Sequence, residues 1–164
     1  MDRVALVVLR REIEADCAVA NDAANLANDR FVGREPRDLE ATAYQLVRCY
    51  NAIEQAGLRL AKAFENQIDD ESAWHAELMR RLTLDIPGIR PAVFDKSDLV
   101  HLRELRGFRH VIVHAYDLSL EPKRLELVLA DASSVMEVLG RRFAVFFDAV
   151  ASDFAGENDG GSTQ

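Results

Sequence analysis

The segment Arg103-Glu-Leu-Arg106-Gly-Phe-Arg109-His110-Val-Ile-Val-His114-Ala-Tyr116-Asp117 determines how the rest of the chain is arranged. Apolar residues recur every three positions from Leu99 through Phe108, which predicts the buried stripe of a helix that starts near Ser97, an acceptable N-cap. The same segment carries three arginines, two histidines and a tyrosine. We expect the arginines to form one basic ridge along the exposed face of this helix.

Two long helices are predicted before this segment, from about Val4 to Asn28 and from about Asp38 to Asn66, separated by a Gly- and Pro-containing break at 32–36. Both show apolar residues at helical spacing, and the first is alanine-rich on its inner side. The expected inner positions are Val4, Val8, Ile13, Cys17, Ala20, Ala24 and Ala27, followed by Leu39, Ala43, Leu46, Tyr50, Ile53, Ala56 or Gly57, Leu60 and Phe64. Tyr44 is also interpreted as a structural aromatic residue.

The middle of the chain is irregular. An acidic start at 69–72 predicts a short helix carrying Trp74, Leu78 and Leu82, with His75 on the surface. The following segment, 83–91, contains two prolines and a glycine, so it cannot be a regular helix. Such a long connection often covers a functional site.

The last helix is predicted to begin at Pro122, a residue that suits a first helical position. Its apolar surface is wide enough for two buried faces, one inside the bundle and one against a partner. The residues of this surface are Leu125, Val128, Ala132, Val135, Met136, Leu139, Phe143, Phe146, Phe147 and Val150. Beyond Phe154 the polar, glycine-rich tail 155–164 is expected to be disordered.

The chain has 164 residues, 49% hydrophobic and 29% charged, which fits one globular domain over residues 1–154. No alternating strand pattern is present, so the predicted fold is an all-α, antiparallel bundle of four to five helices. The apolar run before Arg10 is too short for a membrane span or a signal segment, and we expect a cytoplasmic protein. Cys17 and Cys49 are interpreted as small buried hydrophobes.

The formal net charge of −8 disfavours nucleic-acid binding at long range. Residues 80–110, however, contain seven basic and four acidic residues. We expect these basic groups to converge on the Arg109–Tyr116 segment. The competing interpretation is that they are ordinary solvated arginines.

Three kinds of chemistry fit the segment. Arg109 can grip two phosphate oxygens and His114 can exchange a proton near neutral pH, which together suit phosphodiester cleavage without a metal. His110 and His114 are four residues apart and could share a metal with Asp117, although the glutamate of an H-E-x-x-H motif is missing and a zinc site needs three or four ligands. The third interpretation is a helix end whose polar side chains cap carbonyls and meet solvent.

The string Arg109-x4-His114-x-Tyr116 resembles the signature of the HEPN superfamily, and in particular of HepT-like ribonuclease toxins from toxin–antitoxin pairs. An Arg-x4-His pair alone arises easily by chance, whereas the added tyrosine makes the string much rarer. The resemblance implies a helical bundle that acts as a homodimer, with motifs from both subunits facing one cleft. It also implies a metal-independent endoribonuclease that needs no cofactor.

By this resemblance His114 is the general acid and base and Arg109 stabilises the transition state, with His110 and Arg106 in support. RNA rather than DNA is the implied substrate, attacked by its own 2′-hydroxyl. The implied partner is a minimal nucleotidyltransferase antitoxin, which AMPylates the tyrosine at the position of Tyr116 in some pairs. Two alternatives remain: a non-catalytic, substrate-binding subunit of a nucleotidyltransferase, and a structural dimer in which the motif is incidental.

The spacing of the two catalytic candidates raises a geometric problem. At 100° per residue, Arg109 and His114 lie about 140° apart on a continuous helix and could not reach one phosphate. The β-branched run Val111-Ile-Val113 has low helix propensity. We therefore expect the helix to loosen before His114.

Overall fold

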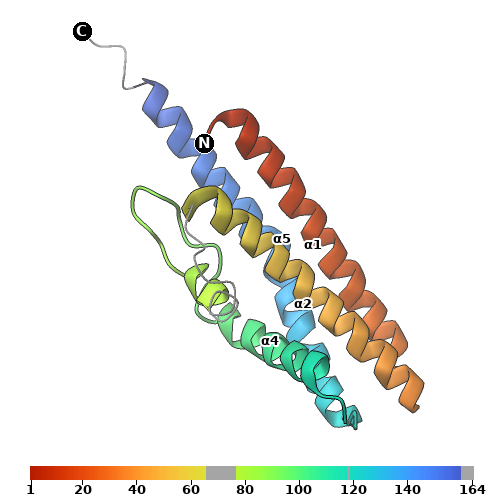
Figure 1. Cartoon of the computed structure of the whole chain (residues 1–164). Helices are drawn as coiled ribbons and strands as arrows, with labels where there is room; N and C mark the ends of the chain where they lie inside the picture. Colours follow the sequence, from red (N-terminus) through yellow and green to blue (C-terminus); the bar gives the residue numbers. More distant parts are fainter. Residues whose placement is uncertain (66–76, 118, 160–164) are drawn as a thin grey trace.

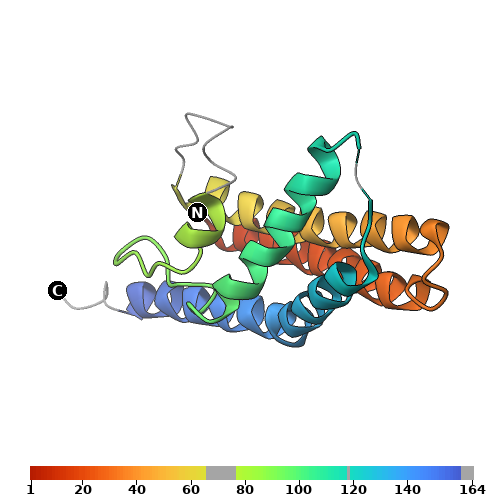
Figure 2. The same cartoon turned by 90° about the horizontal axis from the view of Figure 1, so that it is seen from below.

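The computed structural model describes residues 1–65, 77–117 and 119–159, which form an all-α bundle. Its long helices are α1 (Arg3–Arg30), α2 (Pro36–Glu65), α4 (Asp98–His114) and α5 (Pro122–Asp159), and residues 77–81 are also helical. The described ranges contain no β-strand, only an isolated bridge between Ile86 and Arg90. Helices α1, α2 and α5 run side by side while α4 crosses them obliquely (Figures 1 and 2). The predicted all-α bundle is confirmed.

Helix α1 packs most extensively on α2, through small side chains. Ala20, Ala23, Ala24 and Ala27 are buried in α1, and Cys49, Ala52 and Ala56 are buried in α2. Small residues let two helix axes approach closely. The predicted stripe is wrong in the first turns, where Leu6 and Leu9 are buried while Val4 and Val8 are exposed. The N-terminal run is apolar at almost every position, so periodicity could not select the inner face there.

A glycine lies close to a carboxylate in the turn between α1 and α2. A Cβ atom on Gly33 would collide with Oδ2 of Asp38, so a larger residue there would have to displace that side chain. The same Oδ2 accepts a hydrogen bond from the backbone N–H of Glu35 at 3.3 Å. Asp38 thus closes the turn and places negative charge in the first turn of α2.

Helix α5 buries its wide apolar surface entirely within this chain. Nine of the ten predicted positions are buried, and Met136 is partly buried. Phe146 meets Phe64 of α2 edge to face at 5.5 Å between ring centroids, and Phe143 meets Phe94 at 5.7 Å. The prediction that a second apolar face of α5 awaits a partner is therefore wrong, because the segment around Phe94 and the crossing helix α4 cover it.

The end of α5 lies later than the sequence indicated. The helix runs to Asp159, so the first five residues of the expected tail, 155–159, are helical. A long helix extends easily by further residues because each one adds a backbone hydrogen bond without a new nucleation cost. Residues 160–164 lie outside the described residues.

The connection before α4 is anchored by a buried ion pair. Arg90 donates through Nε to Glu65 at 2.8 Å and through Nη1 to the carbonyl oxygen of Leu84 at 3.1 Å. Arg81 also pairs with Glu65, and Arg80 pairs with Glu77. Three of the seven basic residues therefore pair with carboxylates at the end of α2 and in the short helix 77–81. The expected convergence on the Arg109–Tyr116 segment is wrong for Arg80, Arg81 and Arg90.

Two predictions on the middle segment have different outcomes. Leu78 and Leu82 are buried as expected. The predicted acidic helix start, Trp74 and His75 lie outside the described residues. Among the helices of the described ranges, none is long and apolar enough to cross a membrane.

Candidate functional site

The apolar stripe of α4 orients the candidate residues. Leu99, Leu102, Leu105 and Phe108 are buried against the bundle. Ser97 precedes the helix but its side chain makes no capping hydrogen bond. Oδ2 of Asp98 accepts from the backbone N–H of Asp95 at 2.8 Å, which fixes the chain just before the helix.

Helix α4 stays regular through His114. The backbone N–H of Ala115 donates to the carbonyl oxygen of Val111 at 2.9 Å, which continues the helical pattern to the last residue. The predicted loosening at Val111–Val113 is wrong. A β-branched residue costs a helix only about 0.5 kcal/mol, and Ile112 packs against the core.

Because the helix is regular, Arg109 and His114 point in different directions. Nε of Arg109 donates to Oδ1 of Asn51 on α2 at 3.2 Å. Nδ1 of His114 lies 2.8 Å from the carbonyl oxygen of His110 on the outward side of α4. A single chain does not bring Arg109 and His114 onto one phosphate.

His110 and His114 form a stacked pair. Their ring centroids are 4.3 Å apart with an angle of 31° between the planes. A carbonyl oxygen only accepts hydrogen bonds, so Nδ1 of His114 must carry the proton in the contact with His110. In the neutral imidazole this leaves Nε2 as the basic nitrogen, on an exposed side chain at the end of α4.

The metal interpretation finds no geometric support in the part of the chain that the structure describes. There, no three histidine, cysteine, aspartate or glutamate side chains come together in a way that could hold an ion. The two imidazoles pack against each other as tilted rings. A zinc site needs at least three ligands that converge on one ion.

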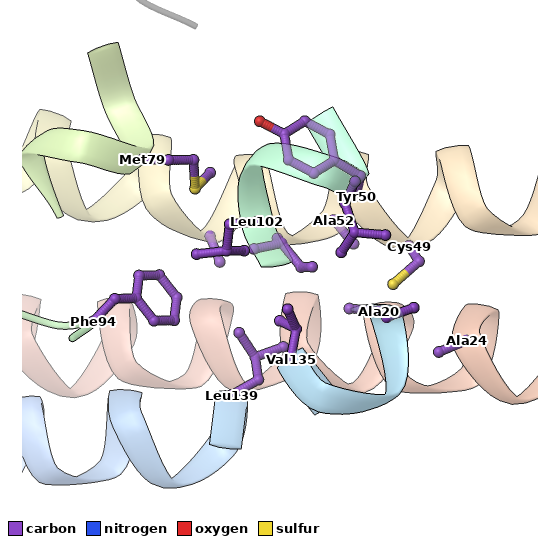
Figure 3. Packing of buried hydrophobic residues seen from close by; sticks show 14 of the residues in the cluster. Ala20, Ala24, Cys49, Tyr50, Ala52, Met79, Phe94, Leu102, Val135 and Leu139 are labelled. Atoms are coloured by element: carbon purple, nitrogen blue, oxygen red, sulfur yellow. The ribbon is translucent and has the colours of Figure 1, made fainter. Parts of the chain in front are cut away.

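A polar cluster lies behind the arginines, between α2 and α4. Tyr50 is fully buried and Glu54 is 6% exposed. Burial first, and the carboxyl of Glu54 next, raise the pKa of Tyr50, while the charges of Arg106 and Arg109 oppose this. Figure 3 shows the Tyr50 hydroxyl pointing away from the alanine side chains of α1.

Arg106 and Arg109 are half-buried against α2, so the predicted exposed ridge is wrong for these two residues and holds only at Arg103.

Helix α4 crosses α2 obliquely (Figure 2), and residues of the two helices meet along this crossing. Arg106 lies near Tyr50, Arg109 contacts Asn51, and Val113 and Tyr116 share a groove with Val47 and Tyr44. From Arg109 to Tyr116, the neighbouring positions on α2 run from Asn51 back to Tyr44. The motif residues on this face consequently lie in a row beside named positions of α2.

A model of the family of HepT-like proteins matches residues 41–150. This chain belongs to the HepT-like family. The match spans two thirds of the chain, from the start of α2 to near the end of α5, and includes Asn51, Arg109, His114 and Tyr116. HepT-like proteins are HEPN proteins of the toxin–antitoxin type. Comparisons with curated proteins and with solved structures found no match.

Tyr116 of this HepT-like protein is fully exposed just beyond α4. Tyr44 on α2 is 65% exposed, so its interpretation as a structural aromatic is wrong, whereas that of Tyr50 is confirmed. Together with Val47 and Val113, the two exposed tyrosines line a groove of about 410 Å³. The aromatic rings of Tyr116 and of Tyr44 are thus exposed to solvent at the end of the motif.

Sequence reasoning missed three residues of the site: Tyr44, Asn51 and Glu54. They are spaced seven and three residues apart along α2, which places them near one edge of its apolar stripe. Such polar and aromatic residues at a stripe edge are the signal that could have found them. Nothing in the sequence showed that this edge faces α4, because the helix order in space depends on the fold.

Proposed function

We propose that this chain is the toxin of a toxin–antitoxin pair, a metal-independent endoribonuclease that acts as a homodimer. The observation that carries the proposal is the state of His114, an exposed imidazole whose Nδ1 is fixed by the His110 carbonyl and whose Nε2 is available as a base. Arg109 lies on the same helical end, held by Asn51. Family membership supports the same chemistry.

The proposed dimer accounts for the separation of Arg109 and His114 on a regular helix. Gly107, His110, Val111 and His114 form the outward side of α4, and Val111 is exposed there. A Cβ atom on Gly107 would meet nothing within 4 Å, so the helix offers a flat surface at that point. A second copy packed on this side would place two His114 imidazoles and two Arg109 guanidinium groups around one cleft.

In the proposed reaction, Nε2 of one His114 removes the proton from a ribose 2′-hydroxyl. The 2′-oxygen attacks the adjacent phosphorus and the bond from phosphorus to the 5′-oxygen breaks. The protonated His114 of the second copy gives its proton to the departing 5′-oxygen. The products are a 2′,3′-cyclic phosphate and a 5′-hydroxyl. The Arg109 pair stabilises the charge on the phosphorane oxygens, while His110 and Arg106 hold the catalytic groups in place.

We also propose that a nucleotidyltransferase antitoxin silences the toxin at Tyr116. The Tyr116 hydroxyl would attack the α-phosphate of ATP, forming a tyrosyl–AMP ester and releasing pyrophosphate. Full exposure of Tyr116 makes the hydroxyl accessible to such a partner. The added phosphate would bring negative charge to the RNA site and repel the substrate.

A second candidate function is a non-catalytic subunit that binds substrate for a nucleotidyltransferase. It is favoured by the separation of Arg109 and His114 in one chain and by the ion pairs that neutralise Arg81 and Arg90. Arg109 alone can hold a phosphate without any proton transfer.

Inducible expression separates the two functions. Wild type, His114→Ala and Arg109→Ala are expressed in a bacterium that lacks the neighbouring genes, and total RNA is examined for fragments. A ribonuclease toxin stops growth and cuts RNA in the wild type, and both folded variants are harmless. If the wild type is as silent as the variants, the ribonuclease proposal fails in this host and the binding-subunit function takes its place.

A further inference from the structure

The groove between Tyr44 and Tyr116 is built from both helices of the site. Tyr44 and Val47 come from α2, Val113 comes from the last turn of α4, and Tyr116 follows directly after it. Neither tyrosine has a role in the core, since Tyr44 is largely exposed and Tyr116 is fully exposed. Aromatic rings gathered at one groove mark a candidate ligand-binding surface.

The two ends of the groove differ in the charge of the nearby side chains. Glu40 lies at one end, and its carboxylate disfavours a phosphate there. Arg109 lies outside the groove lining, one helical turn before Val113 on α4, and brings a positive charge to that side. An occupant that is apolar and flat on the tyrosine side and anionic on the arginine side matches this arrangement.

The dimensions of the arrangement fit one nucleotide. Arg109 and Val113, which lines the groove, are four residues apart on α4, about 6 Å along a helix at 1.5 Å per residue. The groove itself has a volume of about 410 Å³, enough for a single base with its sugar. A nucleotide whose phosphate sits at Arg109 therefore reaches the tyrosines with its base.

We propose that the Tyr44–Tyr116 groove is a subsite that stacks one unpaired RNA base next to the cleaved phosphate. Aromatic side chains hold single-stranded RNA in this way because every base offers a flat π-face. The subsite rests on the proposed ribonuclease function and adds to it the selection of single-stranded over paired RNA. In this proposal Tyr44 binds substrate, and Tyr116 has a second role besides being the site of modification.

The test measures binding rather than cleavage, in a His114→Ala background, by fluorescence anisotropy with a labelled single-stranded oligoribonucleotide. Tyr44→Ala is expected to weaken binding by about 5- to 150-fold, the loss of one stacked base. Tyr44→Phe keeps the ring and is expected to bind within about 3-fold of the parent protein. Val145→Ala removes an equally exposed apolar side chain from α5 and is the matched control.

A second experiment replaces one nucleotide at a time in the oligonucleotide with an abasic nucleotide and measures binding again. At one position the abasic nucleotide is expected to weaken binding to the parent protein as much as Tyr44→Ala does, and to have no further effect on the Tyr44→Ala protein. Equal binding of Tyr44→Ala and parent overturns the subsite. So does a Tyr44→Ala protein that changes from dimer to monomer in size-exclusion chromatography with light scattering, since the groove would then be a contact between copies.

The subsite and the ribonuclease can fail separately. Normal cleavage by a Tyr44→Ala protein with an intact His114 overturns the subsite and leaves the ribonuclease standing. A parent protein that binds no RNA overturns both.

Discussion

Arg109 of α4 donates through Nε to the side-chain oxygen of Asn51 on α2, at 3.2 Å. An arginine held through Nε can still present its two terminal nitrogens to a phosphate. Asn51 therefore acts on the reaction through Arg109, as a positioning residue. The contact also ties the two helices together at the level of the site.

Asn51→Ala is expected to lower RNA cleavage by about 10-fold, because Arg109 loses the group that orients it. Arg109→Lys is expected to lower it further, since lysine keeps the charge but lacks the planar fork. Initial rates of cleavage measure both effects. Asn21→Ala, at an exposed asparagine of α1, is the control. If Asn51→Ala cleaves like wild type while Arg109→Ala is inactive, Asn51 does not position the arginine.

Two helical glycines should respond in opposite directions to alanine. At Gly140 of α5 a Cβ atom meets nothing within 4 Å, so Gly140→Ala is expected to stabilise the fold by about 0.5–1 kcal/mol. At Gly57 of α2 the Cβ would lie 2.7 Å from Cδ1 of the buried Leu82, so Gly57→Ala is expected to destabilise by about 1–2 kcal/mol. Urea unfolding of both variants measures the difference. A stabilising Gly57→Ala would show that α2 and the segment carrying Leu82 are not packed this closely.

The cysteines should be unreactive in the native protein. Burial raises the pKa of Cys17 and of Cys49 to about 12, from an ordinary value of 9.0. The thiolate is the reactive form, so labelling by a thiol-specific disulfide reagent at pH 8 should be slow in the folded state and fast in urea. Burial of the thiols stabilises the fold below the ordinary pKa, and this contribution is lost as pH rises toward the folded value. Labelling of Cys49 within seconds in native protein would contradict its burial.

The sequence predicted the buried face of a helix correctly wherever apolar residues occurred on only one face. The stripe of α2 from Leu39 to Leu60 was correct because polar residues flank it throughout. The buried face at the start of α1 was predicted wrongly, because Val4 and Val8 lie in a run in which every residue is apolar. The wide surface of α5 was identified correctly, but only the packed bundle shows that Phe94 and α4 cover its second face.

The residues of the motif could be identified from the sequence, but their arrangement in space could not. Arg109, His114 and Tyr116 were selected from their spacing, and their roles remain proposals. The regular end of α4 could not be foreseen, because the packing of Ile112 outweighs the low propensity of its neighbours. The contact of Arg109 with Asn51 and the exposure of Tyr44 depend on the register of α2 against α4, which local sequence does not encode.

The most direct test of the account is RNA cleavage by the purified protein in the presence of EDTA, with the product ends identified by mass spectrometry. Total bacterial RNA and a single-stranded oligoribonucleotide serve as substrates. His101→Ala replaces another α4 histidine, which pairs with Asp131 of α5 at 2.7 Å, and is the control for His114→Ala.

The wild type and His101→Ala are expected to leave 2′,3′-cyclic phosphate and 5′-hydroxyl ends. His114→Ala is expected to cleave at least about 100-fold more slowly, the usual contribution of a general acid or base. Cleavage that EDTA abolishes, products with 3′-hydroxyl ends, or a His114→Ala protein as active as the wild type would contradict the account.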